Sequence, residues 1–496
     1  MAINREQPSR FEAEQRQAPL VTALQQCALR SQAAFYTPGH KRGQGATQLL
    51  RELIGQKALQ ADLPELPELD NLLAPAGPIQ AAQKLAAAAF GAEETFFLAN
   101  GSTCGLQAAV LAVCQPGDRI LVPRHAHRSL FTALVLAGAV PVWLQPAYDS
   151  DWDIVRGVTL AQVQRALVQH PAIKAVVLVS PTYLGLCSEV AAIARHVHQF
   201  DLPLIVDEAH GAHFGFHPDL PAAALAAGAD IAVQSTHKVL SALTQASMLH
   251  VQGQRINRDR LRQALAMIQS SSPSYLLLAS LDAARQQMAT QGYSLMKRTL
   301  ELATTARSRL SRISGLRVLS PAAVAPDRLD LTRLTVEVVG LGLNGFDADE
   351  WLHHRLGVTA ELPTARHLTF IVSLGNTAAD LQQLVTAFEQ LTPQASHQSP
   401  PPGSPLPPYS AVPSLTPRQA FFAPTQTVPV QTALGEISAE LICPYPPGIP
   451  LIFPGEKIGP EAIAYLQTIL AAGGTLTGCA DPSLQTVRII SSASLA

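Results

Sequence analysis

Charged residues are scarce in this chain of 496 residues. They make up 15% of it, against 47% hydrophobic residues, and the net charge is −2 at pH 7. No basic run or acidic tail is present, which argues against nucleic acid or an anionic membrane as the main partner. The sequence also lacks an uninterrupted apolar run of about 18 residues, the length that a membrane-spanning helix requires. We therefore expect a small-molecule ligand, with no nucleic acid and no membrane as partner.

Cysteine is scarce as well. The chain has six cysteines and no CxxC pair: Cys27, Cys104, Cys114, Cys187, Cys443 and Cys479. Such scattered cysteines favour free thiols in a reducing cytoplasm over a disulfide framework or a zinc site, and we expect no bound metal. Residues 1–19 are polar and lack the apolar core of a signal peptide, so we expect a cytoplasmic protein.

Apolar segments of strand type alternate with helical segments from about residue 78 onward. The strand candidates are "ETFFLANGS", "DRILVPRHAH", "VPVWLQP", "AIKAVVLVSPTY", "LPLIVDEAH" and "DIAVQSTHK", and the helices predicted between them include 159–169 and 188–200. Continuous apolar strands separated by helices predict an α/β fold with a mostly parallel sheet covered by helices. In such sheets, functional groups cluster beyond the carboxyl ends of the strands.

The rest of the chain divides by composition. We expect an N-terminal helical arm over 1–34 and a large α/β domain over 35–290. A long helix around 290–310 opens a smaller α+β domain, 291–392. A Pro/Ser-rich linker, 393–416, leads to a last domain over 417–496.

Two polar stretches follow predicted strands and suggest one chemistry. Asp207 begins "DEAHGAH", and Lys238 follows it by 31 residues in "QSTHK". Burial lowers the pKa of a lysine amine, which suits a nucleophile that forms a Schiff base with an aldehyde. Pyridoxal 5'-phosphate (PLP) requires such an amine, a carboxylate beside its ring nitrogen and a cradle for its phosphate. Lys238 and Asp207 fit the first two requirements.

Residues for the phosphate and for the two ring faces can also be found. "NGST" supplies Ser102 and Thr103 at a predicted helix start, where backbone N–H groups favour an anion, and Ser235 and His237 flank the lysine. In "PRHAHRSLF", His125 or His127 can stack on one ring face. Ala209 follows Asp207 by two positions, on the same side of an extended chain, and can pack on the other face. Each feature taken singly is more often a cap, a turn or a solvated residue; their order along the chain favours a PLP site.

Several longer motifs extend this pattern over residues 35–456: "FYTPGHKRG", "FGAEETFFLANGST", "SPTYLG", "DEAHGAH", "QSTHKVLSALTQASMLH", "SSSPSYLLLASLDAAR", "PRQAFFA" and "YPPGIPLIFPGE". With them the chain resembles the Orn/Lys/Arg decarboxylase family of fold-type I PLP enzymes, in its short form. The resemblance implies a fold-type I large domain with smaller α+β C-terminal domains. It also implies a homodimer or higher homo-oligomer with active sites at the subunit interface. There we expect "SSSPSY" and Glu456 to act on the cofactor of a neighbouring subunit and "TPGHK" to close over the site from another subunit; a simple turn is the alternative reading of "TPGHK".

The resemblance assigns roles to individual residues. Lys238 looks like the Schiff-base lysine, Asp207 like the acid beside the ring nitrogen, and His210 like the imidazole beside the substrate. The implied phosphate ligands are Ser102, Thr103, Ser235 and His237. The family pattern Arg-Asn-x-His-Lys-Ser aligns with residues 124–129, so the stacking histidine is His127, and His125 occupies the usual place of asparagine.

The implied reaction is decarboxylation of a basic amino acid in polyamine metabolism. Arginine to agmatine is favoured, and lysine to cadaverine or ornithine to putrescine stay open. The alternatives are another fold-type I reaction such as transamination, or a catalytically silent regulatory protein; the presence of Lys238 and Asp207 argues against the last. Candidate substrate contacts are Glu361, Arg366 and Glu456. A helix-start residue is the alternative reading of Glu456, and a solvated residue that of Arg366.

Overall fold

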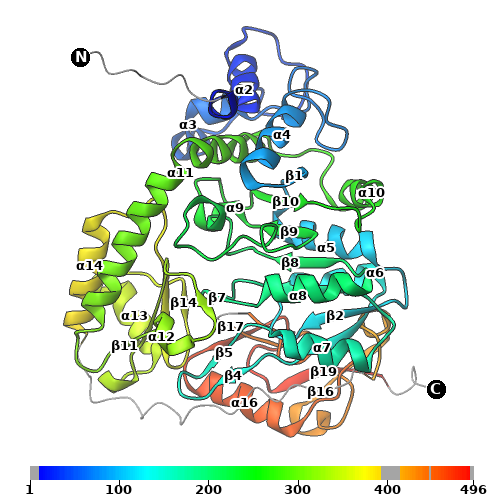
Figure 1. Ribbon diagram of the computed structural model, residues 1–496, viewed down its shortest axis with the longest axis vertical. Helices are drawn as coiled ribbons and strands as arrows, with labels where there is room; N and C mark the ends of the chain where they lie inside the picture. Colours follow the sequence, from blue (N-terminus) through cyan, green and yellow to red (C-terminus); the bar gives the residue numbers. More distant parts are fainter. Residues whose placement is uncertain (1–9, 392–413, 446–447, 492–496) are drawn as a thin grey trace. The chain divides into compact units, whose positions relative to one another are not determined.

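The computed structural model describes residues 10–391, 414–445 and 448–491 (Figure 1). They divide into two compact units. The first comprises the chain up to Ala112 and Glu208–Lys297, and the second comprises Val113–Asp207 and the chain from Arg298 onward. Most of the expected linker, 393–416, lies outside the described residues, and the expected domain boundaries stay predictions.

The first unit contains an antiparallel ladder. Its strands follow the order β1 (Glu94–Leu98), β10 (Ser247–Val251) and β9 (Ile231–Gln234). Strands β1 and β9 were expected, whereas β10 was not. Its helices are α1 (Arg10–Gln15), α2 (Pro19–Leu29), α3 (Gln48–Ala61), α4 (Pro78–Phe90), α5 (Gly101–Val113), α9 (Thr236–Val239), α10 (Arg258–Ile268) and the first part of α11 (Tyr275–Leu310). The long helix thus begins well before the predicted start near residue 290. Its first turns pack into a core with Leu20, Phe97 and Met248.

The second unit contains the parallel part of the fold. Strands β8 (Leu204–Asp207), β6 (Ile173–Val179), β2 (Arg119–Pro123) and β3 (Val140–Leu144) pair in this order, all in parallel. The connecting helices are α6 (Arg128–Ala137), α7 (Leu160–Gln169) and α8 (Val190–Val197). The start of α7 is fixed by a capping box between Thr159 and Gln162. The expected parallel sheet with covering helices is confirmed.

A smaller α+β region of the second unit follows. Its sheet has the antiparallel order β11 (Arg317–Val318), β13 (Arg333–Glu337), β15 (His367–Ile371) and β14 (Leu362–Pro363). The helices α12 (Pro321–Val324), α13 (Gly345–Leu356) and α14 (Ala378–Gln390) accompany it. The short strands β7 (Leu186–Cys187) and β12 (Arg328–Leu329) pair with each other, and so do β4 (Tyr148–Asp149) and β5 (Ile154–Val155).

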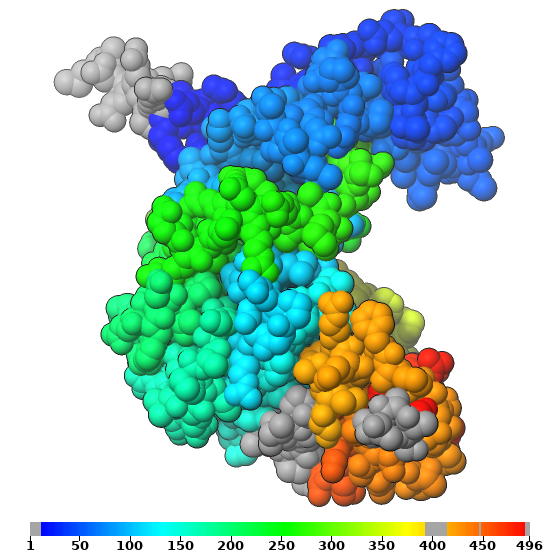
Figure 2. Space-filling model, turned by 90° about the vertical axis from the view of Figure 1, so that its right-hand side faces the viewer, coloured from blue at the N-terminus to red at the C-terminus, as the bar shows by residue number. Residues whose placement is uncertain are grey.

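The C-terminal segment completes the second unit. Its elements are α15 (Pro417–Phe422), β16 (Thr425–Pro429), β17 (Cys443–Tyr445), α16 (Pro460–Ala471), β18 (Thr475–Thr477) and β19 (Thr486–Ile490). Helix α15 packs against α6, and Figure 2 shows the corresponding orange and cyan segments next to each other at the surface.

All six cysteines are free. Within the described ranges, no helix is both long and apolar enough to cross a bilayer. Over the same residues, His, Cys, Asp and Glu side chains form no group of three or more that could hold a metal ion.

Candidate active site

Lys238 and His210 lie in direct contact in the first unit. Strand β9 ends at Gln234, and the one-turn helix α9 carries the lysine immediately beyond it. The lysine Nζ lies 3.0 Å from Nε2 of His210, which follows β8 in a turn. Two of the predicted catalytic residues are therefore close enough to exchange a proton.

The predicted phosphate cradle is partly assembled in the same unit. Helix α5 begins at Gly101, whose φ of 77° is a left-handed conformation that glycine adopts without strain. Ser102 and Thr103 then occupy the first turn, where backbone N–H groups have no partner within the helix. The Ser235 hydroxyl donates to the Ser102 hydroxyl at 2.8 Å, so two of the four predicted ligands converge. Half-buried His237 is adjacent, and burial, followed by the charge of Lys238, lowers its pKa.

Two glutamines that the sequence analysis missed hold the turn before α5. Gln269 Oε1 accepts a hydrogen bond from the Ala99 backbone N–H at 3.0 Å, and Gln245 Nε2 donates to the Ala99 carbonyl at 2.6 Å. They lie 170 and 146 residues away along the chain, so no local pattern reveals them. The cradle is thus positioned from the turn before β10 and from the residue that follows α10.

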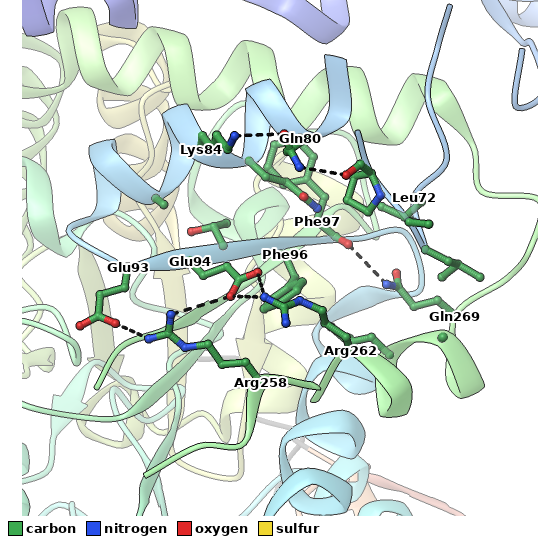
Figure 3. Close-up of a pocket in the computed structure, with 18 residues that line it drawn as sticks. Leu72, Gln80, Lys84, Glu93, Glu94, Phe96, Phe97, Arg258, Arg262 and Gln269 are labelled. Carbon is green, nitrogen blue, oxygen red and sulfur yellow. Dashed lines mark hydrogen bonds and ion pairs between the residues drawn. The ribbon is translucent and has the colours of Figure 1, made fainter. Parts of the chain in front are cut away.

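Gln269 also lines a cavity of about 580 Å³ in the first unit (Figure 3). Arg262 binds both carboxylate oxygens of Glu94, at 2.7 and 2.9 Å, and Arg258 binds Glu93. Lys84 donates to Gln80. The charged groups of this cavity therefore satisfy one another, and we assign it no ligand.

Glu208, the second acid of "DEAHGAH", belongs to a buried structural network. Its carboxylate accepts from Ala224 N at 2.7 Å and from Gln234 Nε2 at 2.8 Å. Gln234 Oε1 lies 3.0 Å from His250 Nε2, and His250 Nδ1 lies 2.8 Å from the Thr95 hydroxyl. This chain of hydrogen bonds connects β9, β10 and β1 beneath the residues that carry Lys238.

Asp207 is the last residue of β8, in the second unit. It is buried, its register partner is Val179 of β6, and its carbonyl accepts from Ser180 N at 3.0 Å. The strand ends there, and residues 209 and 210 lie in a turn. Our premise of an extended chain through Ala209 is therefore wrong, although its role beside the cofactor stays a prediction.

His127 caps helix α6 in the second unit. Its Nδ1 accepts from the Ser129 backbone N–H at 3.2 Å and lies 2.9 Å from the Ser129 hydroxyl. An accepting Nδ1 places the proton of the neutral ring on Nε2. The helix start therefore fixes both the orientation and the tautomer of the residue predicted to stack on the cofactor.

Arg124, three residues earlier, is fully buried and tied to the C-terminal segment. Its guanidinium binds both carboxylate oxygens of Glu456, at 2.8 and 2.7 Å, and donates to the Leu451 carbonyl at 2.9 Å. Its Cζ atom lies 4.2 Å from the ring centre of Phe453 and 4.9 Å from that of Trp143. Bidentate pairing between aromatic faces is a geometry that arginine offers and lysine does not. Residues 451–456 therefore fix the beginning of the loop that carries His127.

The three candidate substrate contacts lie in the second unit. Glu456 is buried against Arg124, and the reading of it as a helix-start residue is wrong, because α16 begins at Pro460 after its cap Gly459. Arg366 donates to Glu337 Oε1 at 3.0 and 2.6 Å. Glu361 is exposed next to β14. Their contacts with substrate stay predictions, and two of them already have charged partners.

Models of one protein family match most of this chain. The family model "Orn/Lys/Arg decarboxylase, major domain" matches residues 18–335, and the C-terminal domain model of the same family matches residues 404–485. An arginine decarboxylase of Bacillus subtilis is 40% identical over 484 residues, which cover 96% of this chain and 98% of that protein. Lysine decarboxylase LdcA of Pseudomonas aeruginosa is 26% identical over 88% of this chain and 74% of its own length.

Solved structures share the fold. The lysine decarboxylase of Francisella novicida superposes with a TM-score of 0.83 at 23% identity, over 96% of this chain and 82% of that one. An alanine–glyoxylate aminotransferase from Nostoc superposes with a TM-score of 0.53 over 64% of this chain and 88% of its own. The resemblance seen in the sequence is confirmed: the chain belongs to the Orn/Lys/Arg decarboxylase family.

Proposed function

We propose that this protein is a PLP-dependent decarboxylase that converts arginine to agmatine and carbon dioxide, as a step of polyamine metabolism. Support for arginine comes from relatives named arginine decarboxylase, which are 37–40% identical over nearly the whole chain, whereas those named lysine decarboxylase are 24–26% identical. Lysine or ornithine would give cadaverine or putrescine by the same chemistry.

One observation carries the proposal: an amine, an imidazole and a pair of converging hydroxyls lie at the ends of neighbouring elements. Lys238 Nζ contacts His210, and Ser102 and Ser235 meet at the first turn of α5. This set fits PLP, which needs an amine for its aldehyde and hydroxyl and N–H donors for its phosphate. When bound, PLP supplies a conjugated ring that accepts the electron pair left behind by departing carbon dioxide.

Each predicted residue has a distinct task in this proposal. Lys238 holds the cofactor covalently, and Ser102, Thr103, Ser235 and His237 hold its phosphate. Asp207 pairs with the ring nitrogen, and its burial strengthens that interaction because little water screens it. His127 covers one ring face and Ala209 the other.

Proton transfer falls to the contacting pair. Lys238 Nζ and His210 Nε2 are 3.0 Å apart, so a proton taken up by one nitrogen can be passed to the other. We assign to this pair the return of a proton to the substrate Cα. Glu361, Arg366 and Glu456 remain our candidates for contacts with the substrate.

We propose a homodimer or higher homo-oligomer as the working form, with active sites completed across the subunit interface. Large apolar side chains of the first unit support it, because Leu29, Phe35, Leu49 and Leu53 are 79–95% exposed. Soluble monomers rarely leave such groups uncovered together. Residues 37–41 and 270–275 are the segments we expect to reach a neighbouring subunit. The six free cysteines suit the reducing cytoplasm that we propose as its location.

The decisive experiment compares Lys238→Ala with Lys297→Ala, an exposed lysine of α11. Each protein is incubated with arginine, lysine and ornithine, and the amine and carbon dioxide are quantified. Treatment with borohydride followed by peptide mass spectrometry locates the cofactor attachment. We expect agmatine from wild type and from Lys297→Ala, with the cofactor fixed to Lys238, and no turnover by Lys238→Ala. Turnover that survives in Lys238→Ala, or a keto acid as product, would overturn the proposal.

A further inference from the structure

The second unit contains a cavity of about 170 Å³ to which the proposed function assigns no role. Its polar lining includes His125, Tyr148, Asp153, Tyr183, His367 and Tyr465. A water molecule occupies roughly 30 Å³ of liquid, so a planar group with a short aliphatic stem has room there. The cavity adjoins predicted cofactor residues of the same unit: Val179, which lines it, is the register partner of Asp207, and His125 precedes His127 by two positions.

Two histidines of this cavity have incomplete hydrogen bonding. His125 is 3% exposed, and neither of its ring nitrogens has a hydrogen-bond partner among the described residues. Nε2 of buried His367 likewise has none in the described part of the chain; the nearest carboxylate oxygen, of Glu337, is 4.0 Å away. Burial lowers the pKa of His125 to about 4, so at neutral pH its ring offers one acceptor and one donor. Leaving such groups buried and unbonded is costly unless a ligand uses them.

The charged side chains in and near the cavity favour the binding of a cation. Asp153 accepts a hydrogen bond from the Tyr148 hydroxyl and lies in the field of Arg366 and Glu337. Arg366 pairs with Glu337 at 2.6 Å, and Arg317 pairs with Glu337 at 3.1 Å. Arg317 also pairs with Asp151 at 2.6 Å. Asp153 is the one carboxylate among the described residues that line the cavity, and no lysine or arginine is among them. Burial raises the pKa of this carboxyl group, a cost that a bound cation would offset, and burial lowers the pKa of both cavity histidines.

The shape and chemistry of the lining select among cations. Phe346 and three tyrosines line the same cavity as Asp153, so aromatic rings and a carboxylate are available to one ligand. A planar guanidinium stacks on aromatic rings and donates several hydrogen bonds in its plane, whereas an ammonium is a compact, strongly hydrated charge. The carboxylate and a neutral imidazole acceptor match such in-plane donors.

We infer that this cavity binds the guanidinium end of the substrate side chain, with Asp153 as the specificity-determining counter-charge. The inference rests on the proposed arginine decarboxylation. It also gives a role to His125, the residue that departs from the family pattern, as an acceptor for a guanidinium N–H.

The first test compares Asp153→Asn with Asp201→Asn. Asp201 is an exposed residue of the same unit, and its left-handed backbone (φ 54°) is one that asparagine also adopts. A hydrogen bond to a charged group contributes about 1.5–3 kcal/mol, so KM for arginine rises by about 10- to 150-fold in Asp153→Asn. We expect kcat, the bound-cofactor spectrum and all properties of Asp201→Asn to change little. Equal KM values in the two variants would refute the assignment.

A binding measurement separates this inference from the proposed function. Propylguanidine, which carries the guanidinium on a short stem, is titrated into the holoenzyme by calorimetry and tested as an inhibitor against arginine. We expect competitive inhibition, and binding that weakens in Asp153→Asn but not in Asp201→Asn. Non-competitive inhibition, or binding indifferent to Asp153, would overturn the inference. If wild type makes no agmatine, the proposed function fails, while the Asp153 dependence of propylguanidine binding still decides what the cavity recognises.

Discussion

His250 in the first unit and His125 in the second are equally buried but differ in their hydrogen bonds. Burial lowers the pKa of His250 to about 3 and that of His125 to about 4, so both are neutral near pH 7. His250 uses both ring nitrogens, toward Thr95 and Gln234, and stacks on Phe90 at 4.8 Å. His125 has no such bonds within the described residues. Burial and a shifted pKa therefore do not distinguish a structural histidine from a ligand-binding one; completed hydrogen bonding does.

The largest effect is expected at a buried ion pair in the same unit as His125. Arg124→Ala removes the counter-charge of buried Glu456, and breaking one partner of such a pair costs about 3–5 kcal/mol. The free energy of unfolding, measured in urea, should fall by that amount. Arg418→Ala, which removes an exposed arginine on neighbouring α15, is the control and should cost far less. Equal decreases in the free energy of unfolding of both variants would show that the buried pair stabilises the fold no more than an exposed arginine does.

A smaller effect separates the two histidines directly. His250→Leu leaves Oε1 of the Gln234 side chain and the Thr95 hydroxyl without their partner, and each orphaned group costs about 1–3 kcal/mol. His125→Leu orphans no partner, so we expect a change within about 1 kcal/mol. Urea unfolding of both variants at pH 7 measures the difference. A comparable loss in His125→Leu would contradict the contrast between the two sites.

The smallest effect is the loss of stability on acidification, which should arise in the same way from both buried histidines. His125 takes up a proton near pH 6.5 when unfolded but only near pH 4 when folded, so its stabilising contribution is complete above pH 6.5 and declines as the pH falls. The loss at pH 5.5 amounts to about 1 kcal/mol. His125→Leu should therefore lose about that much less stability than wild type between pH 7 and 5.5. Identical slopes would mean that His125 is not buried as described.

The sequence predicted elements whose pattern is local. Alternating apolar strands and helices, the helix start near Ser102 and the position of Lys238 just after a strand all follow from short-range signals, and the structure has them. It did not predict α3, because Leu49 and Leu53 are exposed and give this helix no clear apolar face toward a core. Strand β10 was missed because its residues directly follow Lys238, and the whole stretch was interpreted as part of the lysine motif rather than as a strand.

For the candidate site too, the sequence predicted only residues that belong to a local motif. Lys238, His210, Ser102 and Ser235 were predicted, and contacts unite them in pairs. Gln245 and Gln269 were not, because a glutamine carries no spacing signal when its partner is far away in the chain. The Arg124–Glu456 pair escaped for the same reason, and Glu456 was read from its proline-rich surroundings alone.

That pair also sets an order of events during synthesis. Arg124 and Glu456 are separated by 332 residues, and a ribosome adding about 5–20 residues per second needs roughly 17–66 s to cover them. Throughout that interval Glu456, the partner of Arg124 in the folded protein, has not been made, so the buried ion pair cannot form. The loop that carries His127 therefore reaches its final packing only after Glu456 has been made.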